Sequence, residues 1–308
     1  MSRSFPEVLL ELAIENPNIC GVSCDCWGFL GPLAQKFPER AVEIGIAEQN
    51  LIGIAAGLAM QGKIPFAIGM NPFVTMRCFE QIRTDVAYGC RNVKVIGGYG
   101  SGIMYGGWGC THHAMEEIGL MRLIPTMTVM MPADGYETEQ ATRAAAAAEG
   151  PFYISLAGGS LPIDKPEEER SFEVSKAVLL REGDDVTIFG VGATVRDALM
   201  AGDVLAGAGI SARIFSMHTV KPIDKEVILQ AAAETRLIVT IEEHTVIGGL
   251  GGAVAETLAD AGASTPLKRL GLQDVFACMV GSHQDLKDRF GITSEAIVKA
   301  IHDGLDAH

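Results

Sequence analysis

The chain has 308 residues, of which 48% are apolar and 20% are charged, a composition typical of a folded globular protein of about two domains. Asp and Glu outnumber Lys and Arg by 38 to 24, and the net charge of −14 argues against nucleic acid or an anionic membrane as the main partner. No apolar stretch approaches the roughly 18 residues of a membrane span.

The first half of the chain alternates short apolar runs with amphipathic patterns. A helix is expected near the N-terminus, because residues 8, 9, 12 and 13 are apolar on one helical face and acidic residues interrupt the run, unlike in a signal peptide. The last helix of this half is expected to be capped by Asp134 with Glu137. Buried parallel strands are expected at residues 19–23, 64–69, 93–97, 126–130 and 152–156, and helices at 48–61, 78–88 and 135–149.

Residues 161–170 break this pattern, because two prolines and a charge cluster indicate an exposed linker. The alternation then restarts, with strands expected at 186–189, 212–216, 237–242 and 266–270, and helices at 194–207, 225–234, 251–261 and 293–303. The predicted fold class is therefore α/β, with two doubly wound domains built on mainly parallel sheets. Their expected limits are residues 1–163 and a smaller domain at 173–308, joined by a linker at 164–172.

The seven cysteines are scattered along the chain. Cys20, Cys24 and Cys26 cluster, but no matching distant pair accompanies them, so their spacing does not support a zinc site. We expect no metal-ligating set in this chain, and we expect reduced thiols in a cytoplasmic protein.

A carboxylate, Glu48, stands between an apolar run and a helix of very small residues. Gly53 and Gly57 are four residues apart, so one face of this helix is nearly bare backbone and accessible to another helix or a flat ligand. The helix N-terminus favours the anionic form of Glu48, whereas burial opposes it.

The segment Gly45-Ile-Ala-Glu-Gln-Asn50 and its glycine-rich continuation to Ala59 closely resemble the transketolase family of thiamine diphosphate enzymes, in their pyrimidine-binding domain. Further segments fit the same family over essentially the whole chain: residues 72–83, 92–95, 109–113, 122–127, 131–134, 221–224, 242–252 and 289–293. The resemblance implies a pyrimidine-binding domain followed by a transketolase C-terminal domain.

The resemblance also implies roles for residues near the cofactor. The family residue matching Glu48 hydrogen-bonds N1′ of the aminopyrimidine and promotes the imino form that removes the thiazolium C2 proton, so that a ketose carbon–carbon bond can be cleaved. Phe73 matches the aromatic residue that stacks on the pyrimidine, Met76 falls near a second ring-contacting position, and Asp25 lies where relatives carry an acidic residue near the cofactor. Arg77 and its helical neighbours are expected to form a polar or interface-facing surface.

On the substrate side, His112 matches the Thr-His segment of the family and is expected to exchange protons with sugar hydroxyls. His113 stands where many relatives have Gln, and Trp108 stands where they commonly have an acidic residue. We expect all three side chains to bind substrate. His218 and His244, in the second domain, are expected to be structural.

The family's diphosphate motif, Gly-Asp-Gly followed some distance later by Asn, is absent from the chain. The length suits only the last two domains of a full transketolase. The resemblance therefore implies the second subunit of a split enzyme, in which an N-terminal partner subunit holds the diphosphate with Mg²⁺ (or Ca²⁺ or Mn²⁺), in an α₂β₂ heterotetramer. Residues 153–162 lack the family's phosphate-binding Arg, with Leu156 near its place, so we expect a substrate other than an ordinary sugar phosphate, or an anion held by the partner.

Two alternatives stay open at this point. The β-type subunit of a 2-oxo acid decarboxylase or dehydrogenase shares the architecture, although Ala-Glu-Gln-Asn and Gly-Cys-Thr-His favour the ketol transferase. A non-catalytic relative that kept the fold is the other alternative, and intact Glu48 and His112 argue against it.

Overall fold

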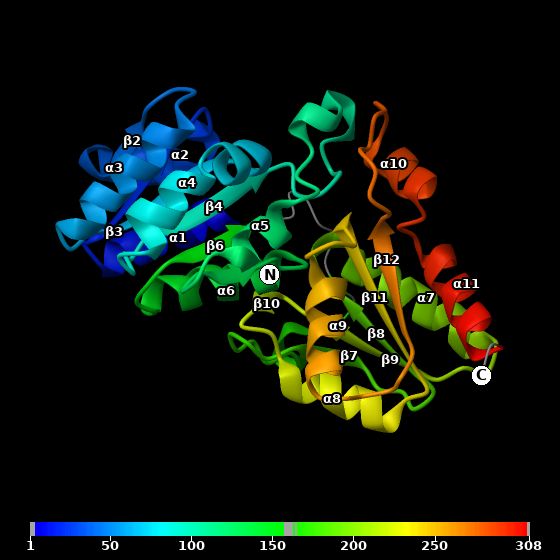
Figure 1. The fold of residues 1–308 in the computed structure, drawn as a ribbon. Coiled ribbons are helices and arrows are strands. Elements are labelled where there is room, and N and C mark those ends of the chain that lie inside the picture. The colour runs from blue at the N-terminus through cyan, green and yellow to red at the C-terminus, as the bar shows by residue number, and fades with distance from the viewer. Residues whose placement is uncertain (1–3, 157–162, 164, 307–308) are drawn as a thin grey trace.

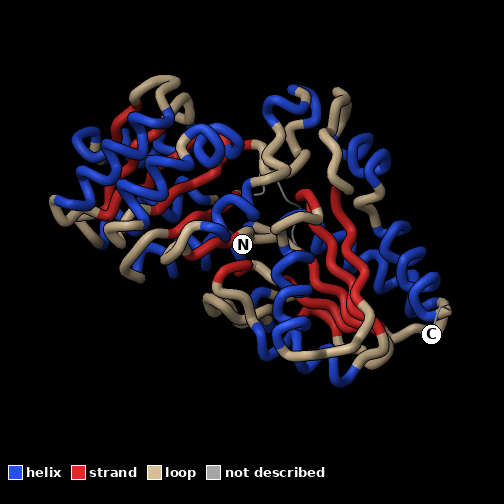
Figure 2. The backbone as a smooth tube through the Cα atoms, viewed as in Figure 1, coloured by secondary structure: helices blue, strands red, loops and turns tan. Residues whose placement is uncertain are grey.

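The computed structural model describes residues 4–156, 163 and 165–306. It contains a seven-stranded sheet and a five-stranded sheet. The two sheets form separate bodies with helices around each (Figures 1 and 2). The predicted α/β fold class is confirmed. None of the helices in the described part of the chain has the length and apolarity that crossing a bilayer requires.

The first sheet has the strand order β10-β5-β6-β4-β3-β1-β2. All neighbouring pairs among β1 to β6 are parallel. The strands are β1 (Ile19–Ser23), β2 (Ala41–Glu43), β3 (Ile64–Met70), β4 (Lys94–Tyr99), β5 (Thr128–Met130), β6 (Phe152–Ser155) and β10 (Thr219–Lys221). Apolar residues bury both faces, as a doubly wound sheet requires.

Helices α1 (Phe5–Glu15), α2 (Trp27–Lys36) and α6 (Gly135–Ala147) supply apolar side chains to one face. Helix α3 (Glu48–Met60), the segment 73–87 and α5 (Glu117–Leu123) cover the other face. Strand β1 lies between β2 and β3, so the chain first adds β2 on one side of β1 and then adds β3 on the opposite side. A crevice at the carboxyl ends of β1 and β3 follows from this reversal, and such crevices are the usual ligand sites of doubly wound sheets.

The second sheet has the order β12-β11-β8-β9-β7, with β7 antiparallel and the other strands parallel. Its strands are β7 (Val178–Arg181), β8 (Val186–Gly190), β9 (Ala212–Ser216), β11 (Leu237–Thr245) and β12 (Leu267–Leu272). Helices α7 (Val195–Gly207) and α11 (Ser294–Leu305) pack on one face, and α8 (Lys225–Glu234) and α9 (Leu250–Asp260) on the other (Figure 1). Helix α10 (His283–Phe290) adds Leu286 to the first of these cores.

Most expected strands and helices appear within two or three residues of their predicted limits, but several elements were not predicted. Helix α2 contains two glycines and Pro32, which lower helix propensity, and its N-cap residue Cys26 makes no side-chain cap. Burial of Leu30 and Leu33 stabilises this helix, which its local sequence does not favour. Helices α5 and α10 and strands β2, β7 and β10 were likewise missed.

The prediction of one α-helix at 78–88 is wrong. The segment instead consists of a π-helical turn at Phe73–Arg77, a short helix α4 (Phe79–Gln81) and a second π-helical turn at Ile82–Ala87. The apolar side chains of Val74, Ile82 and Val86 still pack on the sheet. Hydrophobic spacing alone does not separate these helix types, because both bury one face.

Strand β10 lies in the second half of the sequence but pairs antiparallel with β5 at the edge of the first sheet. The chain therefore returns to the first domain after the linker. The domain limits at 163 and 173 stay a prediction, and this returning strand ties the two halves together.

The predicted cap of α6 is present, since the Asp134 carboxylate accepts a 3.0 Å hydrogen bond from the Glu137 amide. The same carboxylate forms a 2.9 Å ion pair with Arg170, and both side chains are only 2% exposed. Arg170 lies within the expected linker, so Asp134 joins α6 to the linker itself, and the expectation that this stretch is exposed is wrong at Arg170.

Asp134→Asn should lower the free energy of unfolding by about 3 to 5 kcal/mol, because Asn still caps the helix but leaves the buried Arg170 charge without its counterion. Urea unfolding measures the change. Asp303→Asn is the matched control, because it breaks an exposed ion pair with Lys299 and should cost no more than about 1 kcal/mol. Equal losses from the two substitutions would contradict the assignment.

Candidate active site

Glu48 is the first residue of α3 and lies at the carboxyl edge of the first sheet, only 4% exposed. The loop before it is held by Cys24, whose thiol donates to the Gly45 carbonyl at 2.9 Å and accepts from the Ala47 amide at 3.0 Å. Gly45 takes a left-handed conformation, with φ of +70°, which glycine adopts without strain. The sequence thus places a buried carboxylate where the crevice is expected.

The side chain of Arg77 reaches this carboxylate. Its Nη1 lies 2.5 Å from Glu48 Oε2, and its guanidinium carbon lies 4.5 Å from the centroid of the Phe73 ring. Arg77 is exposed, in keeping with the expected polar or interface-facing surface, and its guanidinium in addition reaches the buried carboxylate. Phe73 and Arg77 are the first and last residues of one helical turn, so their side chains lie on the same face of it.

His112 joins this group through ring contacts. Its imidazole meets the Phe73 ring edge-on at 5.2 Å between centroids, and the Trp108 ring at 4.9 Å. The row continues to Tyr105 at 5.6 Å and to Tyr99 at 6.2 Å. The Nδ1 atom of His112 is 2.9 Å from the hydroxyl of the preceding threonine, which orients the ring.

His113 follows on the same loop and is 1% exposed, and neither ring nitrogen makes a well-aligned hydrogen bond with the described residues. Burial lowers the pKa of His113, an effect that the Tyr105 backbone carbonyl only partly offsets. The side chain lines a cavity of about 300 Å³ that it shares with Phe73, Met76 and Arg77. A buried imidazole without a well-aligned partner, lining a cavity, is suited to bind a polar ligand atom.

Asp25 lies in the loop after β1 and adopts a φ of +55°. Its backbone amide donates to Glu43 Oε1 at 2.8 Å, and the Gly45 amide donates to the same oxygen at 2.9 Å. Asp25 is therefore linked to the loop before Glu48 through Glu43, a residue that the motif analysis did not single out.

Residues 1–162 match the family described as "Transketolase, pyrimidine binding domain", and residues 175–297 match "Transketolase, C-terminal domain". This chain belongs to the transketolase family. It is 41% identical over 303 residues to a 6-deoxy-6-sulfo-D-fructose transketolase subunit of Clostridium sp. (strain MSTE9), in a match that covers 97% of this chain and 92% of the relative. It is 38% identical over 299 residues to an apulose-4-phosphate transketolase subunit of Phocaeicola vulgatus, covering 96% and 95%.

A solved structure described as "Split gene transketolase, inactive beta4 tetramer" has the same fold, with a TM-score of 0.87 and 38% identity over 98% of this chain and 96% of that one. The family expectation is thereby confirmed: the chain is a transketolase-like transferase subunit. These relatives also favour it over the 2-oxo acid decarboxylase alternative.

The transketolase motifs did not point to Glu117, which is fully buried next to the loop that carries His112 and His113. Its Oε2 accepts from the Asn71 side-chain amide at 2.9 Å and from the Tyr153 hydroxyl, and its Oε1 accepts from the Ser101 hydroxyl at 2.9 Å. Burial raises the pKa of Glu117, and these donors oppose the shift. The carboxyl connects the start of the Phe73 turn to the His112 loop.

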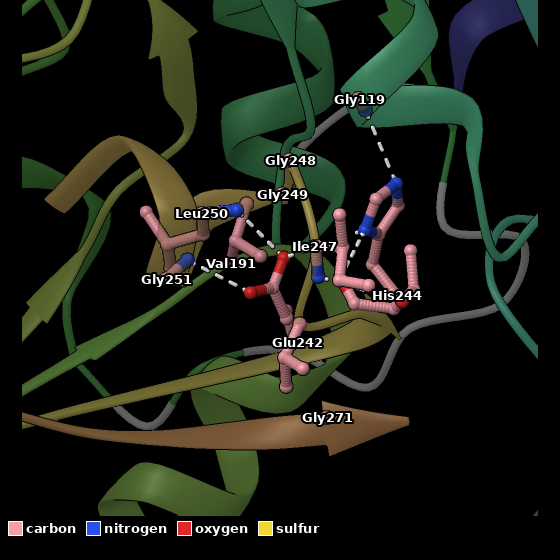
Figure 3. Close-up of polar contacts among 12 residues, drawn as sticks. Gly119, Val191, Glu242, His244, Ile247, Gly248, Gly249, Leu250, Gly251 and Gly271 are labelled. Carbon is pink, nitrogen blue, oxygen red and sulfur yellow. Dashed lines mark hydrogen bonds and ion pairs between the residues drawn. The ribbon is translucent and has the colours of Figure 1, made fainter. Parts of the chain in front are cut away.

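In the second domain of the transketolase chain, Glu242 accepts hydrogen bonds from backbone amides at the N-terminus of α9. Its carboxylate accepts from the Leu250 amide at 2.6 Å and from the Gly251 amide at 2.8 Å (Figure 3). Burial raises its pKa to about 7, although the two amides favour the anion.

The neighbouring His244 connects the two domains. Its Nε2 accepts from the Gly119 amide of α5 at 3.1 Å, and its Nδ1 donates to the Thr245 carbonyl at 2.6 Å (Figure 3). These bonds require the neutral imidazole protonated on Nδ1. Burial accordingly lowers the pKa of His244 to about 4. His218 is also buried, stacked on Phe172 with 4.0 Å between ring centroids. Both residues have the structural surroundings that we expected.

The described residues offer no group of three or more His, Cys, Asp or Glu side chains able to hold a metal ion. All seven cysteines are free thiols, three of them exposed.

The raised pKa of Glu242 makes stability pH-dependent. Its contribution is complete below the unfolded value of 4.5 and is lost as the pH rises through about 7, because the folded chain then has to hold a buried charge. The free energy of unfolding of the wild type should therefore fall on the order of 2 kcal/mol more than that of Glu242→Gln between about pH 5 and about pH 8. Urea titrations across this range measure it. Glu256→Gln, an exposed control, should follow the wild-type curve. Parallel curves for the wild type and Glu242→Gln would refute the assignment.

Proposed function

We propose that this chain is the second subunit of a split transketolase that transfers a two-carbon ketol unit from a ketose donor to an aldose acceptor with thiamine diphosphate. In this proposal Glu48 binds and activates the aminopyrimidine. The observation that carries it is a buried carboxylate and a half-buried aromatic ring, both contacted by the Arg77 guanidinium, at the carboxyl edge of a doubly wound sheet.

The Arg77 guanidinium, which already contacts both Glu48 and Phe73, supports the fit of a pyrimidine there. A guanidinium is planar and carries N–H donors, and the guanidinium of Arg77 contacts the Phe73 ring and donates to Glu48. The pair therefore accommodates a planar nitrogen-bearing group with an N–H directed at the carboxylate. An aminopyrimidine has both properties.

When bound, thiamine diphosphate supplies the carbon nucleophile and the electron sink with which a ketose carbon–carbon bond is broken and remade. Glu48 shares a proton with the pyrimidine ring nitrogen, and its burial keeps water from competing for that hydrogen bond. Phe73 stacks on the ring, Met76 contacts it at the edge of the cavity, and Asp25 lies near the cofactor on the neighbouring loop.

Substrate binding is assigned to His112, His113 and Trp108. Thr111 orients the imidazole of His112, which exchanges protons with hydroxyl or carbonyl oxygens of the sugar. The buried nitrogens of His113 satisfy a substrate oxygen that enters the cavity. Trp108, 62% exposed, offers an apolar face and one N–H donor in place of an acidic side chain.

The diphosphate half is assigned to a separate N-terminal subunit, which binds Mg²⁺ (or Ca²⁺ or Mn²⁺), in a cytoplasmic α₂β₂ assembly. Exposed apolar side chains near the site support such a partner, with Ile46 73%, Trp108 62% and Phe276 69% exposed. The names of relatives, "subunit" and "split gene", support the same division.

The principal test is ketol transfer by the chain purified together with its partner subunit. Glu48→Gln should lower kcat by at least about 100-fold, because general acid–base assistance of this kind contributes about 10² to 10⁴ in rate. Glu39→Gln, which changes an exposed carboxylate, is the control and should leave turnover unchanged. Undiminished turnover by Glu48→Gln would overturn the cofactor role.

Substrate preference is a second test. We expect kcat/KM for an uncommon sugar to exceed that for xylulose 5-phosphate, because Trp108 replaces an acidic residue and residues 153–162 carry no phosphate-binding Arg. Residues 157–162 of that segment lie outside the described residues. The names of two relatives, for a sulfosugar and for apulose 4-phosphate, support the expectation. Competing donors assayed on the same complex decide it, and a strong preference for xylulose 5-phosphate would contradict it.

A further inference from the structure

Arg77 has no role in the proposed chemistry, yet it occupies the centre of the site. Its Nη1 lies 2.5 Å from the buried Oε2 of Glu48, and its guanidinium lies against the Phe73 ring at 4.5 Å. The Glu48 side chain is 5% exposed and that of Arg77 44% exposed. One end of the ion pair is thus fixed in the protein, and the other end reaches it from the surface.

We propose that Arg77 is a displaceable occupant of the pyrimidine site, which competes with the aminopyrimidine for Glu48 and Phe73 and so sets the affinity of this subunit for its cofactor. The inference rests on the proposed function, since it takes Glu48 and Phe73 as the pyrimidine-binding pair.

Competition follows from the hydrogen-bonding chemistry. A guanidinium donates hydrogen bonds and accepts none, so Arg77 pairs with the ionised carboxylate. A ring nitrogen that shares a proton with Glu48 needs the same carboxyl group, and a stacked ring needs the same face of Phe73. Arg77 and the pyrimidine are therefore mutually exclusive.

Displacement requires only a side-chain movement. Arg77 is the last residue of the π-helical turn, and its long, flexible side chain is nearly half exposed. The adjoining cavity, of about 300 Å³, has room for the side chain beside Phe73. Ion pairs with an exposed partner contribute little to stability, because water and salt compete for the charges. A ring that covers Phe73 and bonds Glu48 can therefore replace the guanidinium without rearranging the backbone.

The test measures binding rather than turnover. The full-length chain is titrated calorimetrically with 4-amino-5-hydroxymethyl-2-methylpyrimidine, the uncharged pyrimidine half of thiamine. Arg77→Gln should bind it roughly 2- to 5-fold more tightly than the wild type, the range expected from losing one partly exposed ion pair. Arg83→Gln removes the same charge from an exposed position six residues further along and should match the wild type. Arg77→Lys keeps the charge but lacks the planar fork, and should lie between the two.

Ionic strength provides an independent arm. Raising salt from about 0.05 to about 0.5 M weakens the ion pair, so it should tighten binding by the wild type and leave Arg77→Gln unchanged. Equal affinity of Arg77→Gln and the wild type, including no detectable binding by either, overturns the inference, as does weaker binding by Arg77→Gln.

The titration also separates this inference from the proposed function. Glu48→Gln should bind the pyrimidine more weakly than Arg77→Gln, because the acceptor itself is altered. If Glu48→Gln binds as tightly as Arg77→Gln, Glu48 is not the pyrimidine partner and the proposed function fails. If only Glu48→Gln differs from the wild type, the proposed function stands and the role of Arg77 falls.

Discussion

Glu48 places a carboxylate in the interior at the first residue of α3, and a buried carboxylate is costly unless a donor or a positive charge accompanies it. The surroundings of Glu48 meet this requirement. The helix N-terminus favours the anion, Cys24 holds the preceding loop, and the guanidinium of Arg77 donates directly to Oε2. Because Arg77 also lies on Phe73, which contacts His112, the positions of the candidate site residues depend on how this single charge is compensated.

Buried carboxyl groups also hold together the parts of the chain that surround the site. Glu117 connects Asn71, just before the Phe73 turn, to Ser101 at the start of the His112 loop. Glu242 anchors the N-terminus of α9, and the adjacent His244 reaches α5 of the first domain. Since each group is buried and hydrogen-bonded, each restricts two segments to one relative position. The loop with the catalytic candidates is thus held from both domains.

In the proposed function, this chain provides one half of the active site and a partner subunit provides the other. The half in this chain offers an acceptor and an aromatic ring for a pyrimidine, while the described residues offer no metal-ligating group for a diphosphate. The exposed apolar side chains beside it suit coverage by another subunit. In this view Arg77 has a physical rationale, because it compensates the Glu48 charge whenever the pyrimidine does not.

The sequence by itself determined the α/β class, the positions of most strands and helices, and the family, because apolar runs and the Ala-Glu-Gln-Asn motif are local signals. It also singled out Glu48, Phe73 and His112, which the structure brings into one connected group. It did not reveal α2, whose glycines and proline oppose a helix until Leu30 and Leu33 are buried. Nor did it reveal strand β10, which joins the first sheet across more than 80 residues of chain.

Only the tertiary structure decided which side chain compensates Glu48, because Arg77 lies 29 residues away along the chain. The hydrogen bonds around Glu117 and the burial of His113 were decided in the same way. Local patterns report which residues are buried, whereas the partner of a buried charge depends on where distant segments meet.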